Sequence, residues 1–283
     1  MTGPIRFDGQ VVLVTGSGRG LGAAYATAFA ARGASVVVHD AGVEPDGSGS
    51  DHELADTVVE EIVRAGGTAA AAYENLESEH ACRRLVEFAM ERFGRLDAVI
   101  HNAGLVIWEE LEDAHQSWER MRRVHVDAPF HVTRAAWPVM KEQAYGRFVF
   151  TTSGRAMAMD RTRPGLAAYA VGKMAQFGLM IVVAAEGAPH GIRANAVAPA
   201  AATRVLRRPV VPGELEPEQV TPGVVFLASD QRGFSGKVLE AAGGEFDVAA
   251  WSSSEEVDFG REPVEPDVIA ERWAEIEGVA QPA

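Results

Sequence analysis

Short apolar runs alternate along this chain with longer stretches in which apolar residues recur at helical spacing. Val11–Thr15 is a continuous apolar run, as expected of a strand that is buried on both faces. Leu21–Arg32 then carries one apolar stripe and stops at Gly33, which is typical of an amphipathic helix. The same rhythm predicts further strands at Ser35–His39, Thr68–Tyr73, Leu96–His101, Arg147–Thr152, Arg193–Val197 and Lys237–Ala241. It predicts further helices at Asp51–Ala65, Cys82–Phe93, Ala167–Glu186 and Glu218–Ala228, with one or two in His115–Met140.

This alternation predicts an α/β fold, namely a single Rossmann-type, doubly wound parallel sheet of about seven strands with helices on both faces. In such a sheet the ligand sites lie at the carboxyl ends of the strands. The sheet pattern stops after Gly244, so we assign residues 1–248 to this domain. Residues 249–283 form a polar C-terminal extension with one amphipathic stretch, Pro266–Ile276, and we expect no independent domain there.

The composition excludes some classes of function. The chain has 283 residues, of which 47% are hydrophobic and 23% are charged, and its net charge is −14. A nucleic-acid binder needs a basic surface, so nucleic acid is not an expected partner. No long uncharged apolar run suggests a membrane span, and residues 1–9 lack the order of a signal peptide. With Cys82 as the single cysteine, these features predict a cytoplasmic protein without an internal disulfide, and no metal site is expected.

A glycine-rich turn joins the first predicted strand to the first predicted helix. Residues 15–22 read T-G-S-G-R-G-L-G, so Gly16, Gly20 and Gly22 follow a G-x-x-x-G-x-G spacing. Glycine permits the tight turn and lets the backbone approach a pyrophosphate, which the free N–H groups of a helix N-terminus attract. A run of glycines can be a plain turn, but its position between strand and helix favours dinucleotide binding.

Two charged residues bear on which dinucleotide binds. Asp40 ends the second strand, where a carboxylate can accept hydrogen bonds from both adenosine ribose hydroxyls and repel a 2′-phosphate. An aspartate that only caps a turn is the structural alternative. Arg19 lies inside the glycine turn and argues the other way, because a cation there could reach a 2′-phosphate. We weigh Asp40 more heavily and expect NAD as the cofactor, with NADP as the alternative.

A second constellation carries acid–base chemistry. Tyr169 and Lys173 are one helical turn apart, so they share a helix face. The pKa of a free tyrosine is about 10, and a nearby ammonium group stabilises the phenolate. This spacing alone is common on surface helices, but Ser153 ends the strand Arg147–Thr152 at the edge where active sites of this architecture lie. Its hydroxyl can bind the substrate oxygen and orient it toward Tyr169.

Taken together, these motifs resemble the short-chain dehydrogenase/reductase family over about residues 7–245. The resemblance rests on the glycine turn at 15–22, Asn102-Ala103-Gly104, Ser153, the Tyr169–Lys173 pair and Pro199. Stretches such as VHVDAPFHVTRAAWPVMK and EPDVIAERWAEI look closer to one branch of the family. That branch is the (3R)-hydroxyacyl-CoA dehydrogenase unit of peroxisomal multifunctional enzyme type 2.

The family resemblance implies a role for each matching residue. Tyr169 is the implied acid and base, Lys173 lowers its pKa and holds the nicotinamide ribose, and Ser153 polarises the substrate oxygen. The implied cofactor contacts are Gly16, Arg19, Gly20, Leu21, Asp40, Glu74, Asn75, Asn102, Ala103, Gly104, Tyr169, Lys173, Pro199, Ala202 and Thr203. A homodimer or homotetramer is implied as well, formed through the long helices within 115–140 and 167–186.

Some departures from the family pattern affect the site. His125 stands where the family usually has an asparagine, and we expect it to serve a variant proton relay. The spacing from Ser153 to Tyr169 is longer than usual, which places an insertion within Met157–Pro164 and puts the shape of the substrate pocket in doubt.

Arginines gather near the expected pocket. Arg161 and Arg163 lie in the insertion, and Arg204 and Arg207 follow the sixth predicted strand. Arginine suits phosphate and carboxylate groups, so these residues favour an anionic substrate such as an acyl-CoA. Pairing with the surplus carboxylates of the chain is the alternative interpretation.

We therefore expect an NAD(P)-dependent oxidoreductase that interconverts a secondary alcohol and a ketone on a small-molecule substrate, either 3-hydroxyacyl-CoA or steroid-like. An NADPH-dependent ketoreductase of specialised metabolism is the alternative among enzymes. A dinucleotide-binding sensor without turnover is the alternative from another class. The presence of Ser153, Tyr169 and Lys173 argues against the sensor.

Overall fold

The structure is a computed structural model that describes residues 3–44, 48–203, 211–231 and 233–278. The chain divides into two compact units, residues 1–249 and residues 250–283. The second unit holds two short helices, α9 Pro266–Glu271 and α10 Trp273–Glu277. Arg272 separates them, ion-paired with Glu275 and with its guanidinium 4.7 Å from the ring centre of Phe259. The predicted amphipathic stretch is therefore interrupted by a break at Arg272.

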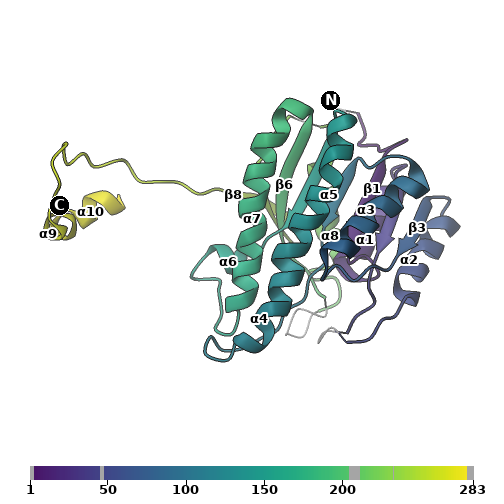
Figure 1. Cartoon of the computed structure of the whole chain (residues 1–283), viewed down its shortest axis with the longest axis horizontal. Coiled ribbons are helices and arrows are strands. Elements are labelled where there is room, and N and C mark those ends of the chain that lie inside the picture. Colours follow the sequence, from purple (N-terminus) through teal and green to yellow (C-terminus); the bar gives the residue numbers. More distant parts are fainter. Residues whose placement is uncertain (1–2, 45–47, 204–210, 232, 279–283) are drawn as a thin grey trace. The chain divides into compact units, whose positions relative to one another are not determined.

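The sheet of the first unit has eight strands in the order β3-β2-β1-β4-β5-β6-β7-β8 (Figure 1). Strands β1 to β7 run parallel, and β8 pairs antiparallel with β7. The strand order reverses direction at the β1–β4 pair, which is the switch point where Rossmann-type sheets bind ligands. The strands are β1 Val11–Thr15, β2 Ser35–His39, β3 Thr68–Ala72, β4 Ala98–His101, β5 Gly146–Thr151, β6 Ile192–Ala200, β7 Val238–Ala242 and β8 Glu245–Ala249.

Helices cover both faces of the sheet because successive strand residues point to opposite sides. Val12 and Val14 of β1 lie in a core shared with α1 and α8, whereas Val11 and Leu13 lie in a second core with α3, α5 and α7. Figure 1 shows α3, α5 and α7 together over one face. The helices are α1 Gly20–Ala30, α2 Glu53–Arg64, α3 Glu79–Phe93, α4 His115–Arg122, α5 Ala128–Glu142, α6 Gly154–Met157, α7 Ala167–Gly187 and α8 Pro217–Leu227, with a π-helix η1 Arg123–Asp127 and a 3-10 helix η2 Ala188–His190.

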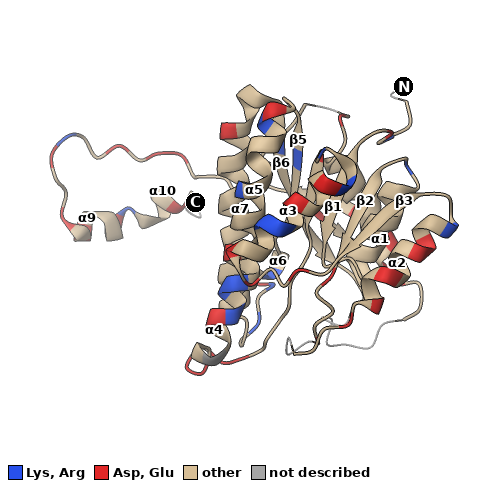
Figure 2. Cartoon of the chain, turned by 45° about the vertical axis from the view of Figure 1, so that its right-hand side comes forward, with Lys and Arg blue, Asp and Glu red and all other residues tan. Residues whose placement is uncertain are grey.

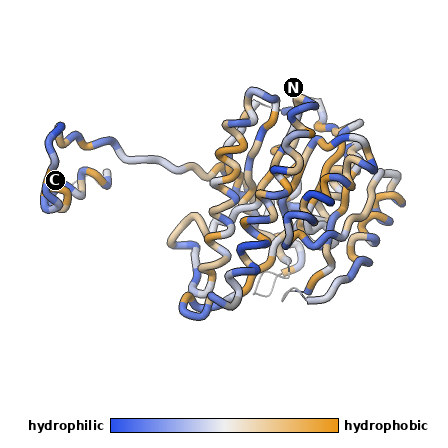
Figure 3. The backbone as a smooth tube through the Cα atoms, in the orientation of Figure 1, coloured by the Kyte–Doolittle hydropathy of each residue, from blue (hydrophilic) through white to orange (hydrophobic). Residues whose placement is uncertain are grey.

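Charge and hydropathy follow these layers. In Figure 2 the strands β1 and β2 carry no charged residue, while acids and bases lie along helices such as α2 and α3. Figure 3 shows the same division as hydrophobic strands beside helices that alternate between the two characters. The doubly wound α/β sheet expected from the sequence is confirmed.

One strand of this sheet escaped the sequence pattern. The structure adds β8 after Gly244, so the expectation that the sheet ends there is wrong. Four of the five β8 residues are exposed and the fifth is half-buried, so the strand lacks the apolar signature of a buried strand. Gly243 and Gly244 make the turn that returns the chain beside β7, with φ angles of 56° and 85°.

The helix α7 continues into η2, and together they are long and apolar enough, by length and composition, to cross a membrane. This is weak evidence for a membrane span, because the core helix of a soluble protein passes the same test. Seven residues of α7, among them Met180 and Val183, are buried. Since both lie in the core beneath α3 and α5, packing on the sheet accounts for much of this apolar character.

Candidate active site

A cavity of roughly 840 Å³ opens where the carboxyl ends of the central strands meet. That volume lies in the upper part of the range of ligand pockets, about 300–1,000 Å³. Its lining extends from the glycine turn to α7 and to the loop after α6. The predicted site residues that line it are Gly16, Arg19, Gly20, Leu21, Asp40, Asn75, Asn102, Ala103, Gly104, His125, Ser153, Arg161, Arg163, Tyr169, Lys173, Pro199, Ala202 and Thr203.

Three of the predicted site residues are not placed at the cavity. Glu74 is not among the lining residues; its backbone oxygen accepts a hydrogen bond from His39 Nε2 at 2.7 Å. The adjacent residue Asn75 does line the cavity. Arg204 and Arg207 fall in 204–210, outside the described residues.

The glycine turn is shaped by contacts that leave no room for side chains. A Cβ on Gly22 would lie 2.2 Å from the backbone oxygen of Gly16, and one on Gly16 would lie 2.7 Å from Ala103 Cα. Gly16 and Gly20 also adopt positive φ angles of 65° and 56°. Among the described residues, no side chain caps the N-terminus of α1 and no acid stands in its first turn. Its N–H groups therefore remain available to an anion such as a pyrophosphate.

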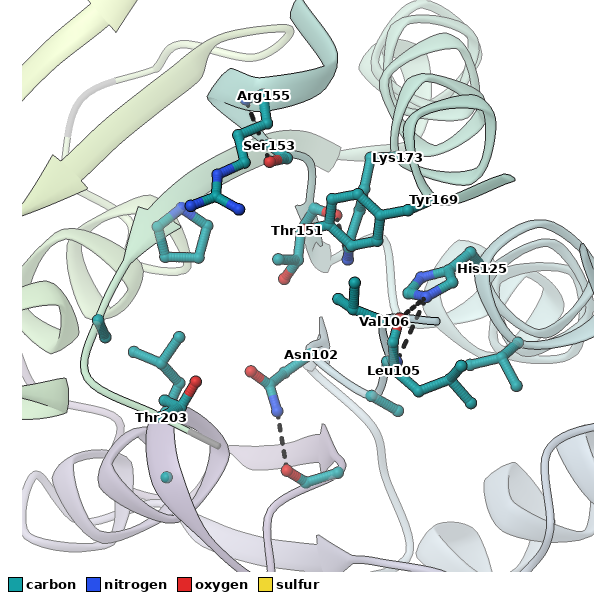
Figure 4. A pocket seen from close by; sticks show the side chains of 18 of the residues that line it. Asn102, Leu105, Val106, His125, Thr151, Ser153, Arg155, Tyr169, Lys173 and Thr203 are labelled. Atoms are coloured by element: carbon teal, nitrogen blue, oxygen red, sulfur yellow. Dashed lines mark hydrogen bonds between the residues drawn. The ribbon is translucent and has the colours of Figure 1, made fainter. Parts of the chain in front are cut away.

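Thr15 and Asn102 join the ends of β1 and β4 next to this turn. The Thr15 hydroxyl accepts hydrogen bonds from the backbone N–H groups of Asn102 and Ala103, at 3.1 and 3.0 Å. The Asn102 amide donates to the backbone oxygens of Thr15 and Gly16 at 3.1 and 2.8 Å (Figure 4). The sequence motif included Thr15, but its structural role as the acceptor that fixes the Asn102–Ala103 segment was missed.

Asp40 is buried at the end of β2, next to the glycine turn. Its two carboxylate oxygens accept the backbone N–H groups of Gly18 and Gly42, each at 2.9 Å. Each oxygen keeps a further lone pair for a ligand. Arg19 donates through Nη2 to Val43 O at 3.0 Å, while its Nε is buried without a partner among the described residues. This orphaned donor and the glycine cradle fit the phosphates of a dinucleotide.

Ser153, Tyr169 and Lys173 meet at the other end of the cavity (Figure 4). Ser153 follows β5 and caps the short helix α6, its hydroxyl accepting the Arg155 N–H at 3.3 Å. Tyr169 and Lys173 stand one turn apart on α7, with Lys173 Nζ 5.7 Å from the Tyr169 ring centre. The ammonium nitrogen donates to Thr151 O at 3.0 Å, which ties α7 to the end of β5.

Burial and charge act against each other on these groups. Burial raises the pKa of Tyr169, while the hydrogen bond with Ser153 and the positive charge of Arg155 pull that pKa down. Burial lowers the pKa of Lys173 to about 7, because the charged ammonium loses water inside the protein. Burial thus favours the neutral form of both side chains, and only the pKa of Lys173 lies where a proton is exchanged near neutral pH.

His125 lies in the π-helix η1, a turn type that often occurs at functional sites. Its Nε2–H donates to Leu105 O at 2.7 Å, and its ring stands edge-on to Tyr169 at 5.7 Å between ring centres. Burial lowers the pKa of His125 to about 3, so the ring is neutral. Nε2 also lies 3.3 Å from the Leu105 backbone nitrogen, but the shorter contact with Leu105 O assigns the proton to Nε2. In this tautomer Nδ1 is an acceptor, buried and without a partner among the described residues. Gly172 makes room for it, since a Cβ there would lie 2.5 Å from His125 Cβ.

The longer segment between Ser153 and Tyr169 forms the opposite wall. Arg161 forms a two-fold hydrogen-bonded ion pair with Glu240 of β7, at 2.8 and 2.7 Å. Glu240 stands directly opposite Asp247 of β8, so Arg161 neutralises a pair of like charges across two strands. Arg163 donates to the backbone oxygens of Asp160 and Thr162. Both arginines line the cavity, but each already has oxygen partners.

Arg155 and Trp108 belong to the same wall, and neither was predicted as a site residue. The guanidinium of Arg155 lies 5.8 Å from the ring centre of Trp108, and both residues line the cavity. A lone arginine two positions after the candidate serine gives little signal in a single sequence.

Comparisons with known proteins show the family to which this chain is similar. Residues 10–213 match the model of the family described as short chain dehydrogenase. The mouse protein named peroxisomal multifunctional enzyme type 2 is 38% identical over 285 residues, which cover 98% of this chain. The chain spans 38% of the length of that mouse protein.

Solved structures show the same architecture. A short chain dehydrogenase from Mycobacterium avium is 35% identical, with a TM-score of 0.84, and the match covers 98% of this chain and 97% of that one. A 7α-hydroxysteroid dehydrogenase solved with NADH and a 7-oxo bile acid is 28% identical, with a TM-score of 0.75 over 84% of this chain and 95% of that one.

Proposed function

The chain belongs to the short-chain dehydrogenase family, an oxidoreductase family that binds a nicotinamide dinucleotide, and from this premise we propose an NAD-dependent dehydrogenase of 3-hydroxyacyl-CoA thioesters. The observation that carries this proposal is the convergence of Ser153, Tyr169 and Lys173 at one end of a cavity that begins at the glycine turn. The reaction interconverts a secondary alcohol and a ketone.

The three residues divide the proton chemistry among them. The Ser153 hydroxyl holds the substrate oxygen, and Tyr169 takes the hydroxyl proton during oxidation or returns it during reduction. The bound nicotinamide supplies the other half of the reaction, since it accepts or gives the hydride at the carbinol carbon. Lys173 favours the phenolate of Tyr169 when charged, and the acceptor nitrogen of His125 is placed to hold a relay water beside it.

The cofactor is held by the two sides of the glycine turn. Gly16, Gly20, Leu21 and the N-terminus of α1 would hold the pyrophosphate, with Arg19 as the cation beside it. Among the other residues that line the cavity, we assign Asn102, Ala103, Gly104 and Asn75 to the adenosine and Pro199, Ala202 and Thr203 to the nicotinamide.

NAD is favoured over NADP by the position of Asp40. A buried carboxylate at the end of β2 accepts ribose hydroxyls and repels a 2′-phosphate. Its two oxygens accept the backbone N–H groups of Gly18 and Gly42, which fixes the direction in which the carboxylate points. The unpartnered Nε of Arg19 is the observation on the other side, and it serves the pyrophosphate equally well.

The thioester substrate is supported by the resemblance of the sequence to the (3R)-hydroxyacyl-CoA dehydrogenase unit of peroxisomal multifunctional enzyme type 2, the name that the mouse relative carries. A steroid-like alcohol is the second candidate, because a structural neighbour was solved with a 7-oxo bile acid. The lining of the pocket gives less reason to prefer the thioester over the steroid. Arg161 and Arg163, which were expected to bind an anionic substrate, already have partners inside the protein.

Initial rates test the proposal. The purified chain is assayed for formation of NADH from NAD, and of NADPH from NADP, with (3R)-hydroxyacyl-CoA thioesters and with hydroxysteroids. We expect the thioester with NAD to give the highest kcat/KM, and Tyr169→Phe to lose most of it, about 10²–10⁴-fold, while still binding NADH. A strong preference for NADPH would contradict the cofactor assignment, and full activity of Tyr169→Phe would contradict the mechanism.

The oligomeric state is a further part of the proposal. Val171, Ile181 and Val182 are exposed apolar residues on α7, one of the long helices through which the sequence predicted that a second copy would bind. A homodimer or homotetramer covers this face. Light scattering that gives the mass of a single chain would contradict this oligomeric state. The cytoplasmic location stays a prediction.

A further inference from the structure

The guanidinium of Arg155 reaches into the cavity beside the candidate catalytic serine. Arg155 is the second residue of α6, and its backbone N–H is bound to the Ser153 hydroxyl. Figure 4 shows the side chain turned from α6 into the pocket, on the side of Ser153 and facing Tyr169. The positive charge acts on the reacting end of the cavity, because it lowers the pKa of Tyr169 against the effect of burial.

Arg155 differs from the other described arginines that line this cavity. Arg19 donates to Val43 O, Arg161 to both carboxylate oxygens of Glu240, and Arg163 to two backbone oxygens. Arg120 is ion-paired with Glu77. Within the described residues, the guanidinium of Arg155 contacts the Trp108 ring and has no oxygen partner.

A guanidinium stacked near an aromatic ring keeps its in-plane N–H donors free. Within the described residues, no acid is ion-paired with this guanidinium, which is exposed toward the cavity and can donate to a ligand oxygen there. Since Ser153 and Tyr169 take the reacting oxygen of the substrate, Arg155 is available to a second oxygen close to it. The phosphates of coenzyme A are a whole pantetheine arm away from the thioester, so they cannot fill this place.

We propose that Arg155 donates a hydrogen bond to the acyl oxygen of the substrate, the oxygen two carbons from the reacting carbon. This contact rests on the proposed dehydrogenase function and names the chemical feature that the enzyme selects. A 3-oxoacyl thioester places two oxygens in a 1,3 relation, one for Ser153 and Tyr169 and one for Arg155. A plain ketone or a ring alcohol offers only the first.

Direct binding of two coenzyme A derivatives, a thioester and a thioether, tests the contact without turnover. Butanoyl-CoA carries the acyl oxygen, whereas the thioether butyl-CoA has the same chain and lacks it. Their dissociation constants from the NADH-bound protein are measured by calorimetry for the wild type and for Arg155→Met, Arg155→Lys and Arg163→Met. Methionine keeps an apolar stem against Trp108, and Arg163→Met removes the same charge from the same wall.

We expect the wild type to bind butanoyl-CoA more tightly than butyl-CoA by about 10- to 100-fold, the effect of one hydrogen bond from a charged donor. Arg155→Met should remove most of this ratio, Arg155→Lys should keep part of it, and Arg163→Met should leave it within about two-fold. Binding of NADH, followed by its fluorescence, confirms that each variant is folded.

Two outcomes overturn the proposal. One is an undiminished ratio in Arg155→Met. The other is a loss of binding in Arg155→Met that is confined to free 3-oxobutanoate, which would make Arg155 a carboxylate site. Lack of any turnover that depends on Tyr169 would instead overturn the proposed function, whereas the ratio of the two dissociation constants reports on Arg155 by itself.

Discussion

The two ends of the cavity are built in different ways. At the cofactor end, backbone and side-chain groups are buried and hydrogen-bonded to one another, as in the Thr15–Asn102 and Asp40–Gly18 contacts. At the substrate end, the wall between Ser153 and Leu166 is a short helix and a loop whose residues are largely exposed, Met159 at 93%. An ion pair, Arg161–Glu240, ties that loop to β7. The difference separates a fixed frame for the dinucleotide from a wall that can vary with the substrate.

The largest expected effect comes from Gly22→Ala at the cofactor end, compared with the same substitution of Gly154 at the substrate end. Gly22→Ala drives a Cβ into the Gly16 carbonyl, so we expect it to cost about 1–3 kcal/mol of stability and to abolish measurable NADH binding. At Gly154 the nearest atoms are the flexible ends of Arg161 and Glu240, at 3.3 Å. Gly154→Ala should change stability by less than about 0.5 kcal/mol. Thermal melts and NADH fluorescence compare the two, and equal damage would remove the contrast between the ends.

Lys173 lies where the two ends meet, and its burial predicts a pH-dependent stability. Its pKa is lowered from 10.5 to about 7 in the folded state, so between these values the unfolded chain binds more protons. The destabilisation caused by burying the charged ammonium is complete below pH 7 and disappears as the pH rises toward 10.5. At pH 6 we expect cofactor-free Lys173→Met to have a free energy of unfolding above that of the wild type by on the order of a few kcal/mol, and so to melt at a higher temperature. Near pH 10 the two proteins should have similar stability.

Melting curves at several pH values check this expectation. The exposed Lys141→Met serves as the control, and its difference from the wild type should not vary with pH. A stabilisation by Lys173→Met that is the same at pH 6 and pH 10 would show that lysine burial is not its cause. Activity of Lys173→Met should be lost at every pH.

Asp40 tests how strictly the cofactor end selects its ligand. Asp40→Asn removes the charge and keeps one acceptor oxygen, so the ratio of kcat/KM for NAD to that for NADP should fall at least about ten-fold. Asp51→Asn, on the exposed loop nearby, should leave the ratio unchanged. An unaltered ratio in Asp40→Asn would mean that Arg19 or the backbone sets the preference.

The smallest effect belongs to the ion pair of the substrate wall. Glu240→Gln weakens the contact with Arg161, whose side chain is 54% exposed, so the change in stability should stay below about 1 kcal/mol. The KM of the substrate should rise about two- to five-fold as the loop loosens. Glu245→Gln on the adjoining strand is the control, and an equal rise in its KM would contradict a role of the ion pair.

The sequence predicted the cofactor end and the acid–base residues better than the substrate wall. Gly16 and Asn102 follow the ends of strands, and Tyr169 lies one helical turn before Lys173, so the local sequence pattern predicts the positions of all three. Arg161 pairs with Glu240, which is far away in the sequence and stands opposite Asp247 across β7 and β8. No local sequence pattern encodes this contact. Arg155 gave no signal because its importance comes from where α6 points its side chain.

The antiparallel strand β8 also changes how the sheet presents its border to other molecules. An open strand border offers unpaired backbone groups to which a foreign strand can add, which is how many proteins begin to aggregate. In this protein β8 covers β7 and carries Glu245 and Asp247, both exposed. Two such borders approaching each other would bring acids against acids. The strand that the sequence pattern missed therefore helps to keep copies of this sheet from joining into fibres.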